Sequence, residues 1–397
     1  MHIFPTLFLL TLLTGSLIRI PLFFNVMIYP HDIALCIYLL SWFIWKIGKK
    51  ETIVFSPFIK PLAIFMAALL VSFLVNAFGH TVEECVHGIS YSIRMLLYMG
   101  LYIIISNTKN PLFWLKRLYG IGVIFGIAGI VQYILYPNLR NLEYLGWDPH
   151  YYRLFSTFLD PNFAGLFLVL TFLLGFSFIF KRQERLEYLL FQAIVLTALL
   201  LTLSRSSYSA FVASVSVYLW WKKSWKLLAG IILFIIVVFY TPFPQKSVTP
   251  LLRGETIKAR MENWAYSMDL FKKKPVFGYG FNLLRTIQEP GLSTKEPFQI
   301  SHASGGVDNS FLFVLVTSGI VGGICFIRFC ISLWNMGKKL AETKKERRLG
   351  MIFLISLVAI AAHSMFVNSF FYPWILIWLW IVTGVVEKKV TCNCSDS

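Results

Sequence analysis

The sequence carries few charged residues for its length. Only 14% of its 397 residues are Asp, Glu, Lys or Arg, whereas a soluble domain carries about 25%. Hydrophobic residues make up 57% of the chain, and the mean hydropathy is +0.69. Side chains of this composition do not cover a globule with polar surface, so the sequence excludes a water-soluble protein.

Cysteine is also scarce and forms no disulfide framework. Six cysteines are scattered, most of them in hydrophobic blocks, where a free thiol acts as a small apolar side chain. Cys392-x-Cys394 has no further ligand near it, which disfavours a metal site. The sequence has no Walker loop, no GxGxxG after a strand, no HExxH and no GxSxG elbow. We therefore expect no metal and no cofactor, and any reaction must use an already activated substrate.

The hydrophobic residues stand in continuous blocks, without the alternating pattern of a membrane barrel. Each block has about 18–25 residues, the length of a helix that crosses the hydrocarbon layer. We predict an all-α polytopic integral membrane protein with about twelve transmembrane helices. The first block lacks a basic leader and a convincing cleavage site, so we expect a retained helix. The predicted spans are residues 3–24, 31–47, 58–78, 89–106, 112–136, 160–180, 187–203, 206–221, 225–241, 308–335, 350–369 and 371–386.

Polar segments divide the chain into four parts. Residues 1–136 hold helices one to five, and residues 137–241 hold an outer loop followed by helices six to nine. Residues 242–307 form one large extracytoplasmic loop, because no other polar segment is long enough to fold. Residues 308–397 hold helices ten to twelve, the last two separated by little more than Tyr372-Pro373, and a cytoplasmic tail.

Lysine and arginine predict the orientation of these helices. Positive residues stay on the cytoplasmic side, so we expect a cytoplasmic membrane protein with both termini in the cytoplasm. The net charge of +17 then reflects a bilayer partner rather than nucleic acid. The basic residues of every second connection are Lys46, Lys49, Lys50, Lys60, Lys109, Lys116, Arg117, Lys181, Arg182, Arg185, Lys222, Lys223, Lys226, Lys338, Lys339, Lys344, Lys345, Arg347, Arg348, Lys388 and Lys389.

The outer loops carry further basic residues that the orientation does not require. Long loops cross the membrane largely regardless of charge, so these residues are tolerated rather than demanded. A basic outer face suits an anionic partner such as a lipid pyrophosphate, because a guanidinium group binds two phosphate oxygens at once. The outer basic residues are Arg140, Arg153, Arg205, Lys246, Arg253, Lys258, Arg260, Lys272, Lys273, Lys274, Arg285 and Lys295.

Arg205 lies in a turn that joins two hydrophobic spans with almost no loop. The turn reads Leu-Ser-Arg-Ser-Ser over residues 203–207, which places the arginine at the membrane boundary. A charge at that depth is costly unless it is paired or reaches water. Arg205 either extends to the lipid headgroups or holds an anion in an outward-facing cavity, and we favour the anion.

The segment before the sixth span contains a second set of polar residues. Asp160-Pro161 is typical of an N-cap followed by proline at the first helical position. Capping accounts for Asp160 and Pro161 but not for Arg153 or Asn162. Those two side chains could lie over the same cavity as Arg205.

The middle of the large loop predicts a short amphipathic helix. Trp264, Met268 and Phe271 recur at helical spacing, and Pro275 ends the pattern. The lysines at 272–274 suit a helix that lies on the membrane surface. Arg260, at the opposite end, is the better candidate for an anion site.

Two residues near the tenth span could take part in proton transfer. Asp308 either caps the helix that follows it or acts as a base, since it lies beside the basic loop. His302 lies in a Ser- and Gly-rich loop, where a histidine is either solvated or a second candidate base.

Taken in order, these motifs resemble the O-antigen polymerase and ligase superfamily of bacterial polysaccharide assembly. Each motif alone is weak, and their order and common outward placement carry the resemblance, whereas spans one to five match only in being hydrophobic. The motifs are Arg153 with Ser156-Thr157 and Asp160-Pro161-Asn162, Leu201-Thr202-x-Ser204-Arg205, Arg260 with Trp264 and Pro275-x-x-Gly278-x-Gly280, and Asp308-Asn309-Ser310 with Gly319-Ile320-x-Gly322.

The resemblance implies a metal-independent glycosyltransferase that uses polyprenyl-diphosphate-linked glycans on the outer face of the membrane. Arg205 and Arg260 would hold the donor pyrophosphate, with help from Arg153. Asp308 or His302 would accept the proton of the acceptor hydroxyl. The substrate-positioning residues would be Asn162, Trp264 and Asn309. Contact with other membrane proteins of polysaccharide assembly is left open.

The start of the tenth span separates the two branches of this superfamily. The ligase branch carries a His-Asn pair there, and here the pair reads Asp308-Asn309. We therefore expect a polymerase that joins lipid-linked oligosaccharide units of a surface polysaccharide. A ligase with His302 as its base is the first alternative. A glycan or lipid transporter is the second, although the sequence lacks the inverted repeats typical of carriers, and charged groups at membrane depth disfavour a purely structural scaffold.

Overall fold

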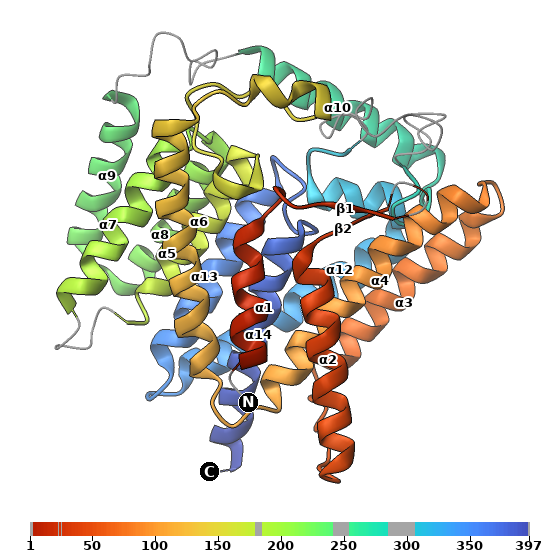
Figure 1. Ribbon diagram of the computed structural model, residues 1–397, viewed down its shortest axis with the longest axis horizontal. Helices are drawn as coiled ribbons and strands as arrows, with labels where there is room; N and C mark the ends of the chain where they lie inside the picture. The colour runs from red at the N-terminus through yellow and green to blue at the C-terminus, as the bar shows by residue number, and fades with distance from the viewer. Residues whose placement is uncertain are drawn as a thin grey trace.

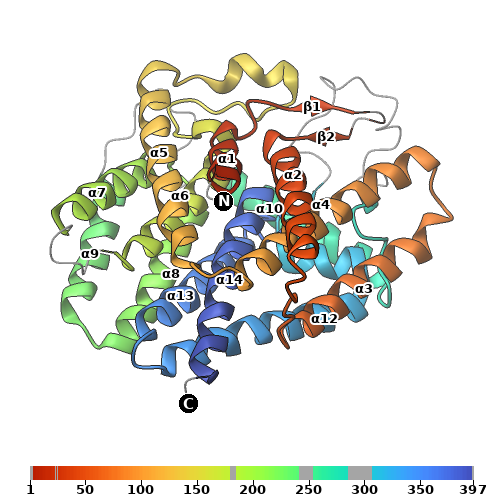
Figure 2. The same ribbon diagram turned by 60° about the horizontal axis from the view of Figure 1, so that its bottom comes forward.

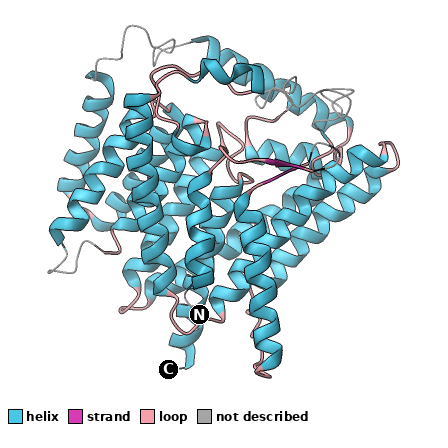
Figure 3. Cartoon of the chain, viewed as in Figure 1, coloured by secondary structure: helices cyan, strands magenta, loops and turns pink. Residues whose placement is uncertain are grey.

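The computed structural model describes residues 3–22, 24, 26–178, 185–240, 254–284 and 306–395. Over these ranges the chain is a bundle of helices with one two-stranded antiparallel hairpin (Figure 3), formed by β1 (Ile20–Pro21) and β2 (Met27–Ile28). The remaining short elements are 3-10 turns: η1 (Leu12–Thr14), η3 (Leu139–Leu145) and η4 (Ser156–Phe158).

Six helices in the described part of the chain are long and apolar enough to cross a membrane. They are α2 (Pro30–Gly48), α3 (Ile59–Ala77), α4 (Val82–Ser106), α5 (Leu112–Leu135), α12 (Ser310–Glu342) and α13 (Arg347–Ser364). Shorter apolar helices stand beside them: α1 (Ile3–Thr11), α6 (Pro161–Gly175) and α7 (Arg185–Leu201). The bundle also contains α8 (Arg205–Lys222), α9 (Trp225–Tyr240) and α14 (Pro373–Ser395). Each predicted span overlaps one of these helices, which supports a polytopic all-α membrane protein.

The bundle is built around α14. This helix packs against α4, α5, α12 and α13, and the turned view places it in the middle of the molecule (Figure 2). Its Trp374, Trp378 and Trp380 are among the largest fully buried side chains. The start of α1 and the end of α14 lie at one end of the bundle, and α10 (Gly254–Lys273) lies across the opposite end (Figure 1).

The first predicted span is wrong in its second half. The α-helix ends at Thr11, and after the turn η1 the chain leaves the bundle as the strand pair. The backbone N–H of Ser16 donates to the carbonyl of Thr157 at 2.7 Å, which holds the turn against the segment before α6. Residues 3–24 form one apolar block by hydropathy, and hydropathy contains no information on a hydrogen bond between distant segments.

The charge of Arg94, inside α4, is neutralised within the bundle. Its Nε lies 3.2 Å from Oδ2 of Asp32 in α2. The Tyr98 hydroxyl donates to the other carboxylate oxygen of Asp32 at 2.6 Å. A buried charge that is paired and hydrogen-bonded in this way is tolerated, and it joins the start of α2 to the middle of α4.

Helix α12 is broken at Gly319, a feature that the sequence prediction of one continuous span missed. Gly319 has φ of 65°, in the left-handed region that favours glycine. Residues 275–280 lie against the break: Tyr279 N donates to Val316 O at 2.9 Å, and Ile320 N donates to Pro275 O at 2.8 Å. A Cβ on Gly319 would overlap the carbonyl of Val276, so the two glycine-containing motifs hold each other.

The link between the last two helices is longer than predicted. Residues 365–372, not Tyr372-Pro373 alone, connect α13 to α14 without regular helix. Phe370 N donates to the Ser310 hydroxyl at 3.1 Å, which fixes the link to the start of α12. The link is rich in apolar side chains, so its hydropathy alone predicts a continuing membrane helix. In the structure these side chains pack against neighbouring helices without forming a helix themselves.

Helix α10 confirms the predicted amphipathic helix of the large loop. Its last residue is Lys273, just before Pro275. Ser267 and Leu270 are buried, whereas Met261 and Tyr266 are exposed. The helix packs on α12. His302 lies outside the described residues.

Candidate functional site

The first residues of α6, α8 and α12 meet around the C-terminal end of α13. Ser204 Oγ, before α8, donates to Asn162 Oδ1 of α6 at 2.9 Å. Asn309 Nδ2, before α12, donates to the carbonyl of Met365 at 3.1 Å. Three helix N-termini therefore converge, and each contributes the positive end of a helix dipole, which favours an anion.

Each of these helices begins at a side-chain cap. Asp160 Oδ1 accepts from the backbone N–H groups of Asn162 and Phe163 at 2.6 and 3.3 Å, which confirms the predicted cap. At α12 the cap is Asn309, whose Oδ1 accepts from the second and third helical N–H groups. The interpretation of Asp308 as the cap is wrong. Asp308 and Asn309 both carry a side chain that can cap a helix. Asn309 is the cap because α12 begins at Ser310.

Arg153 lies buried against the turn that carries Arg205. Its Nε donates to the Thr202 carbonyl at 3.0 Å and its Nη2 to the Leu203 carbonyl at 3.3 Å. Burial lowers the pKa of the Arg153 guanidinium to about 10, and Asp160 opposes this shift. Arg153 is therefore still charged at neutral pH, and its hydrogen bonds to Thr202 and Leu203 hold the turn that precedes Arg205.

Arg205 is the first residue of α8, directly after its cap Ser204. Its charge, with that of Arg260, lowers the pKa of Arg153, so the three guanidinium groups share one electrostatic environment. Arg260, in α10, is half-buried. Burial lowers the pKa of Arg260, while Asp308 raises it and Arg205 lowers it. The structure thus brings together the three arginines that the sequence analysis selected.

Asp308 lies beside this cluster, on the α10 side. Its backbone N–H donates to Asn263 Oδ1 at 3.0 Å, and its carbonyl accepts from Trp264 Nε1 at 3.2 Å. Burial raises the pKa of the Asp308 carboxyl, and the charge of Arg260 lowers it. A carboxylate with a raised pKa is the better proton acceptor.

Two residues of the site escaped the sequence analysis. Burial raises the pKa of Asp148 to about 6, with Asp160 and Asp308 adding to the shift and Arg153 opposing it. His150 Nδ1 lies 3.5 Å from Arg153 Nη1. Both residues come from the loop before α6, where a Trp-Asp-Pro-His segment offered a polar signal without a recognisable motif.

The three predicted substrate-positioning residues hold the protein itself together. Asn162 accepts from Ser204, Asn309 caps α12, and Trp264 holds the Asp308 backbone. These contacts set the positions of Arg205 and Asp308. Whether any of the three also contacts substrate stays a prediction.

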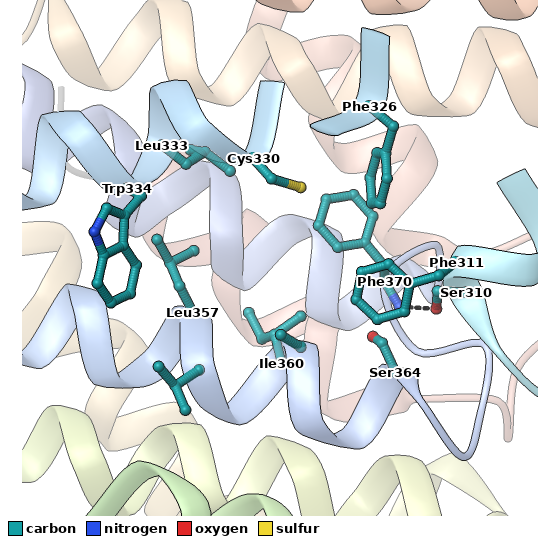
Figure 4. Close-up of a pocket in the computed structure, with 12 residues that line it drawn as sticks. Ser310, Phe311, Phe326, Cys330, Leu333, Trp334, Leu357, Ile360, Ser364 and Phe370 are labelled. Carbon is teal, nitrogen blue, oxygen red and sulfur yellow. Dashed lines mark hydrogen bonds between the residues drawn. The ribbon is translucent and has the colours of Figure 1, made fainter. Parts of the chain in front are cut away.

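An apolar hollow of about 190 Å³ opens beside the site. It lies between the two segments of α12 and α13 (Figure 4), with Phe326, Leu357 and Ile360 among its lining residues. Its polar lining residues include Ser310 and Ser364. Ser310 follows the Asp308-Asn309 pair in the chain. Ser364 follows His363, the residue through which α13 contacts the start of α8. The arginine cluster and the apolar hollow are therefore adjacent.

Metal binding has no ready-made site in the part of the chain that the structure describes. No group of three or more His, Cys, Asp or Glu side chains is arranged there to hold an ion. The site consists instead of three arginines, three aspartates and helix N-termini. The chemistry of such an arrangement suits an anionic ligand, and its carboxylates are groups able to accept a proton.

A comparison with known protein families matches the part of the chain that carries Arg205, Arg260 and Asp308. Residues 189–327 match the family model described as O-antigen ligase. The matched stretch contains the Arg205 turn, α10 with Arg260, Asp308 and the break in α12. The match confirms the resemblance to the O-antigen polymerase and ligase superfamily, although Arg153 and Asp160 lie before the matched residues. No curated protein matches the chain.

Proposed function

We propose that this protein is a glycosyltransferase of surface polysaccharide assembly. The premise is that residues 189–327 match the family model described as O-antigen ligase. Its donor would be a polyprenyl-diphosphate-linked oligosaccharide at the outer face of the cytoplasmic membrane. The reaction would extend one lipid-linked glycan with another, which makes the protein a polymerase.

The observation that carries the proposal is the arginine cluster beside an apolar hollow. Arg153, Arg205 and Arg260 share one environment, and the hollow begins at residues that adjoin the site. A ligand that suits both features has a multiply charged anionic head and an apolar chain. A polyprenyl diphosphate has this form, with its head at the arginines and its first isoprene units in the hollow.

The chemistry follows from the groups present. The hydroxyl oxygen of an acceptor sugar attacks the anomeric carbon of the donor, and the bond from that carbon to the pyrophosphate oxygen breaks. The Asp308 carboxylate takes the hydroxyl proton. Arg205 and Arg260 stabilise the negative charge that grows on the leaving polyprenyl diphosphate, because fixed guanidinium groups need no rearrangement as the charge develops. A general base of this kind contributes about 10²–10⁴-fold.

A ligase is the second candidate. The matching family model is described as O-antigen ligase, and a ligase would use the same donor with a different acceptor lipid. Asp308 stands where the resemblance places the histidine of ligases, which favours the polymerase.

Purified protein in detergent or proteoliposomes tests these candidates. It is incubated with a lipid-linked oligosaccharide alone and then with a second acceptor lipid, and the glycan products are sized. Growth on the donor alone supports the polymerase, and transfer only to the second lipid supports the ligase. Movement of intact donor across the proteoliposome membrane without new glycosidic bonds would overturn the enzyme proposal in favour of transport.

A further inference from the structure

His363 lies in the last turn of α13 and is fully buried. A buried imidazole is costly unless its nitrogens are hydrogen-bonded. Both nitrogens have partners here. Nε2 lies 3.1 Å from the Ser206 hydroxyl and 3.2 Å from the Ser207 hydroxyl, and Nδ1 pairs with the Ser369 hydroxyl.

The partners of Nε2 are the two residues that follow Arg205 in α8. Ser207 Oγ also donates to Ser204 Oγ at 2.9 Å, and Ser204 reaches Asn162 of α6. The approach is close, because a Cβ on Gly165 of α6 would overlap the Ser207 hydroxyl. His363 therefore fixes the first turn of α8, from which the Arg205 side chain extends.

The partner of Nδ1 connects His363 to the start of α12. Ser369 belongs to the link between α13 and α14, and the same link contacts the start of α12 twice. The Met365 carbonyl accepts from Asn309, and Phe370 N donates to the Ser310 hydroxyl. Asp308 directly precedes this anchored start.

We propose that His363 is a positioning residue that sets the Arg205 guanidinium relative to the Asp308 carboxylate. This inference rests on the proposed function, in which Arg205 faces the leaving group and Asp308 faces the acceptor. His363 does not touch the substrate. It joins the starts of α8 and α12 through the hydrogen bonds described above, and a displacement of about 1 Å between reacting groups costs on the order of 10²-fold in rate.

A double-mutant cycle tests the proposal. The variants are His363→Ala, Arg205→Ala and the pair, assayed for kcat and KM in chain growth. We expect His363→Ala to lower kcat by about 10–100-fold with KM within about threefold. In the Arg205→Ala background the same change should cost less than about threefold, because the arginine that it positions is absent.

Two further variants separate positioning from a role in stability alone. His363→Gln keeps a polar group that can reach the serine hydroxyls, and it should recover at least about tenfold of the lost kcat. Gln192→Ala removes another buried hydrogen bond, from Gln192 Nε2 to the Phe172 carbonyl at 2.8 Å in the same bundle. This control should lower the melting temperature as His363→Ala does while leaving kcat within about twofold.

The cycle is repeated on binding of a short-chain prenyl diphosphate, so that failure of this inference can be told from failure of the proposed function. Equal losses from His363→Ala in both backgrounds, in either measurement, would overturn the positioning role. If wild-type protein extends no glycan but His363→Ala weakens prenyl diphosphate binding only when Arg205 is present, the inference stands and the polymerase proposal falls.

Discussion

Arg205 and Arg260 differ from the lysines of the chain in the shape of the charge that they present. A guanidinium group is planar and donates two parallel hydrogen bonds to a phosphate, whereas an ammonium group is a point charge. Both arginines lie in the same electrostatic environment as Arg153 and Asp308. The geometry of the donor headgroup should therefore matter as much as the charge.

Replacing either arginine by lysine keeps the charge and removes the planar fork. We expect Arg205→Lys and Arg260→Lys each to lower kcat/KM for chain growth by about 10–100-fold, the loss of one charge-assisted hydrogen bond at about 1.5–3 kcal/mol. The matched control is Arg140→Lys. The Arg140 guanidinium stacks on the Tyr151 ring in the loop before α6, and the proposed function gives it no role at the donor pyrophosphate. Full-length polymer from both site variants at normal expression would refute the assignment.

Asp148 makes the stability of the protein depend on pH. Its pKa in the folded protein is raised to about 6 from 3.8, mainly by burial. Between these values the native state holds a proton that the unfolded chain has released, so this group's contribution to stability declines as pH rises from about 4 to about 6. The neutral side chain of Asp148→Asn removes that decline.

We expect Asp148→Asn to melt at the same temperature as wild type near pH 4 and at a higher one at pH 7. The difference should correspond to about 1–2 kcal/mol, below the full value of the shift because the group is partly exposed. Melting of both proteins in detergent across this pH range is the measurement. An equal difference at both ends would mean that Asp148 does not titrate in this window.

At the scale of elements, the broken helix α12 and the segment 275–280 form one unit. Gly278 and Gly319 both have positive φ, and a Cβ on either would overlap the backbone of the other segment. The carbonyl of Thr317, next to the break, also accepts from the Ser72 hydroxyl of α3 at 2.7 Å. Backbone freed by a break inside a membrane bundle must find such partners.

Gly319→Ala should disrupt this unit. Left-handed strain and the overlap with Val276 together should lower the free energy of unfolding by about 2–4 kcal/mol, read as a fall in melting temperature. Gly120→Ala is the control, because Gly120 lies in α5 with open space around its Cα. There alanine should be neutral or stabilising by up to about 1 kcal/mol. Equal melting temperatures for the two variants would show that the break is not held by this contact.

At the scale of the whole molecule, the basic connections that the structure describes and the site lie at opposite ends of the bundle. The chain termini share one end, and α10 crosses the other (Figure 1). The positive-inside rule predicts that the termini lie in the cytoplasm, so we expect α10 and the arginine cluster to face outward, where the proposed lipid-linked donor would be.

Cysteine labelling checks this orientation. In a chain whose own cysteines are replaced by serine, Lys258→Cys on α10 should react with a membrane-impermeant maleimide in intact spheroplasts. Lys338→Cys, near the end of α12, should react only after permeabilisation. Both lysines are exposed in the structure, so access and not burial decides the result. The reverse pattern would invert the orientation and place the site in the cytoplasm.

Much of the fold follows from local properties of the chain. A helix that spans a bilayer needs a continuous apolar block, so the blocks predicted where helices form, from α2 to α14. Capping is local too, and Asp160 with Pro161 marked the start of α6 correctly. The charge at Arg205 and Arg260 also stood out locally, because the orientation of the membrane helices did not require it.

Other features depended on contacts between distant segments, and these only the tertiary structure decided. The break at Gly319 exists because residues 275–280 supply its hydrogen bonds, and the cap of α12 is Asn309 because the helix starts one residue later than Asp308 suggested. His363 looked like an ordinary residue of an apolar span until folding placed it between Ser206 and Ser369. A sequence determines by itself which residues prefer lipid, water or a helix end, since these are interactions with the immediate surroundings. Which polar groups share one site depends on how the helices pack, and for this protein that packing gathered scattered arginines and aspartates beside the first residues of α6, α8 and α12.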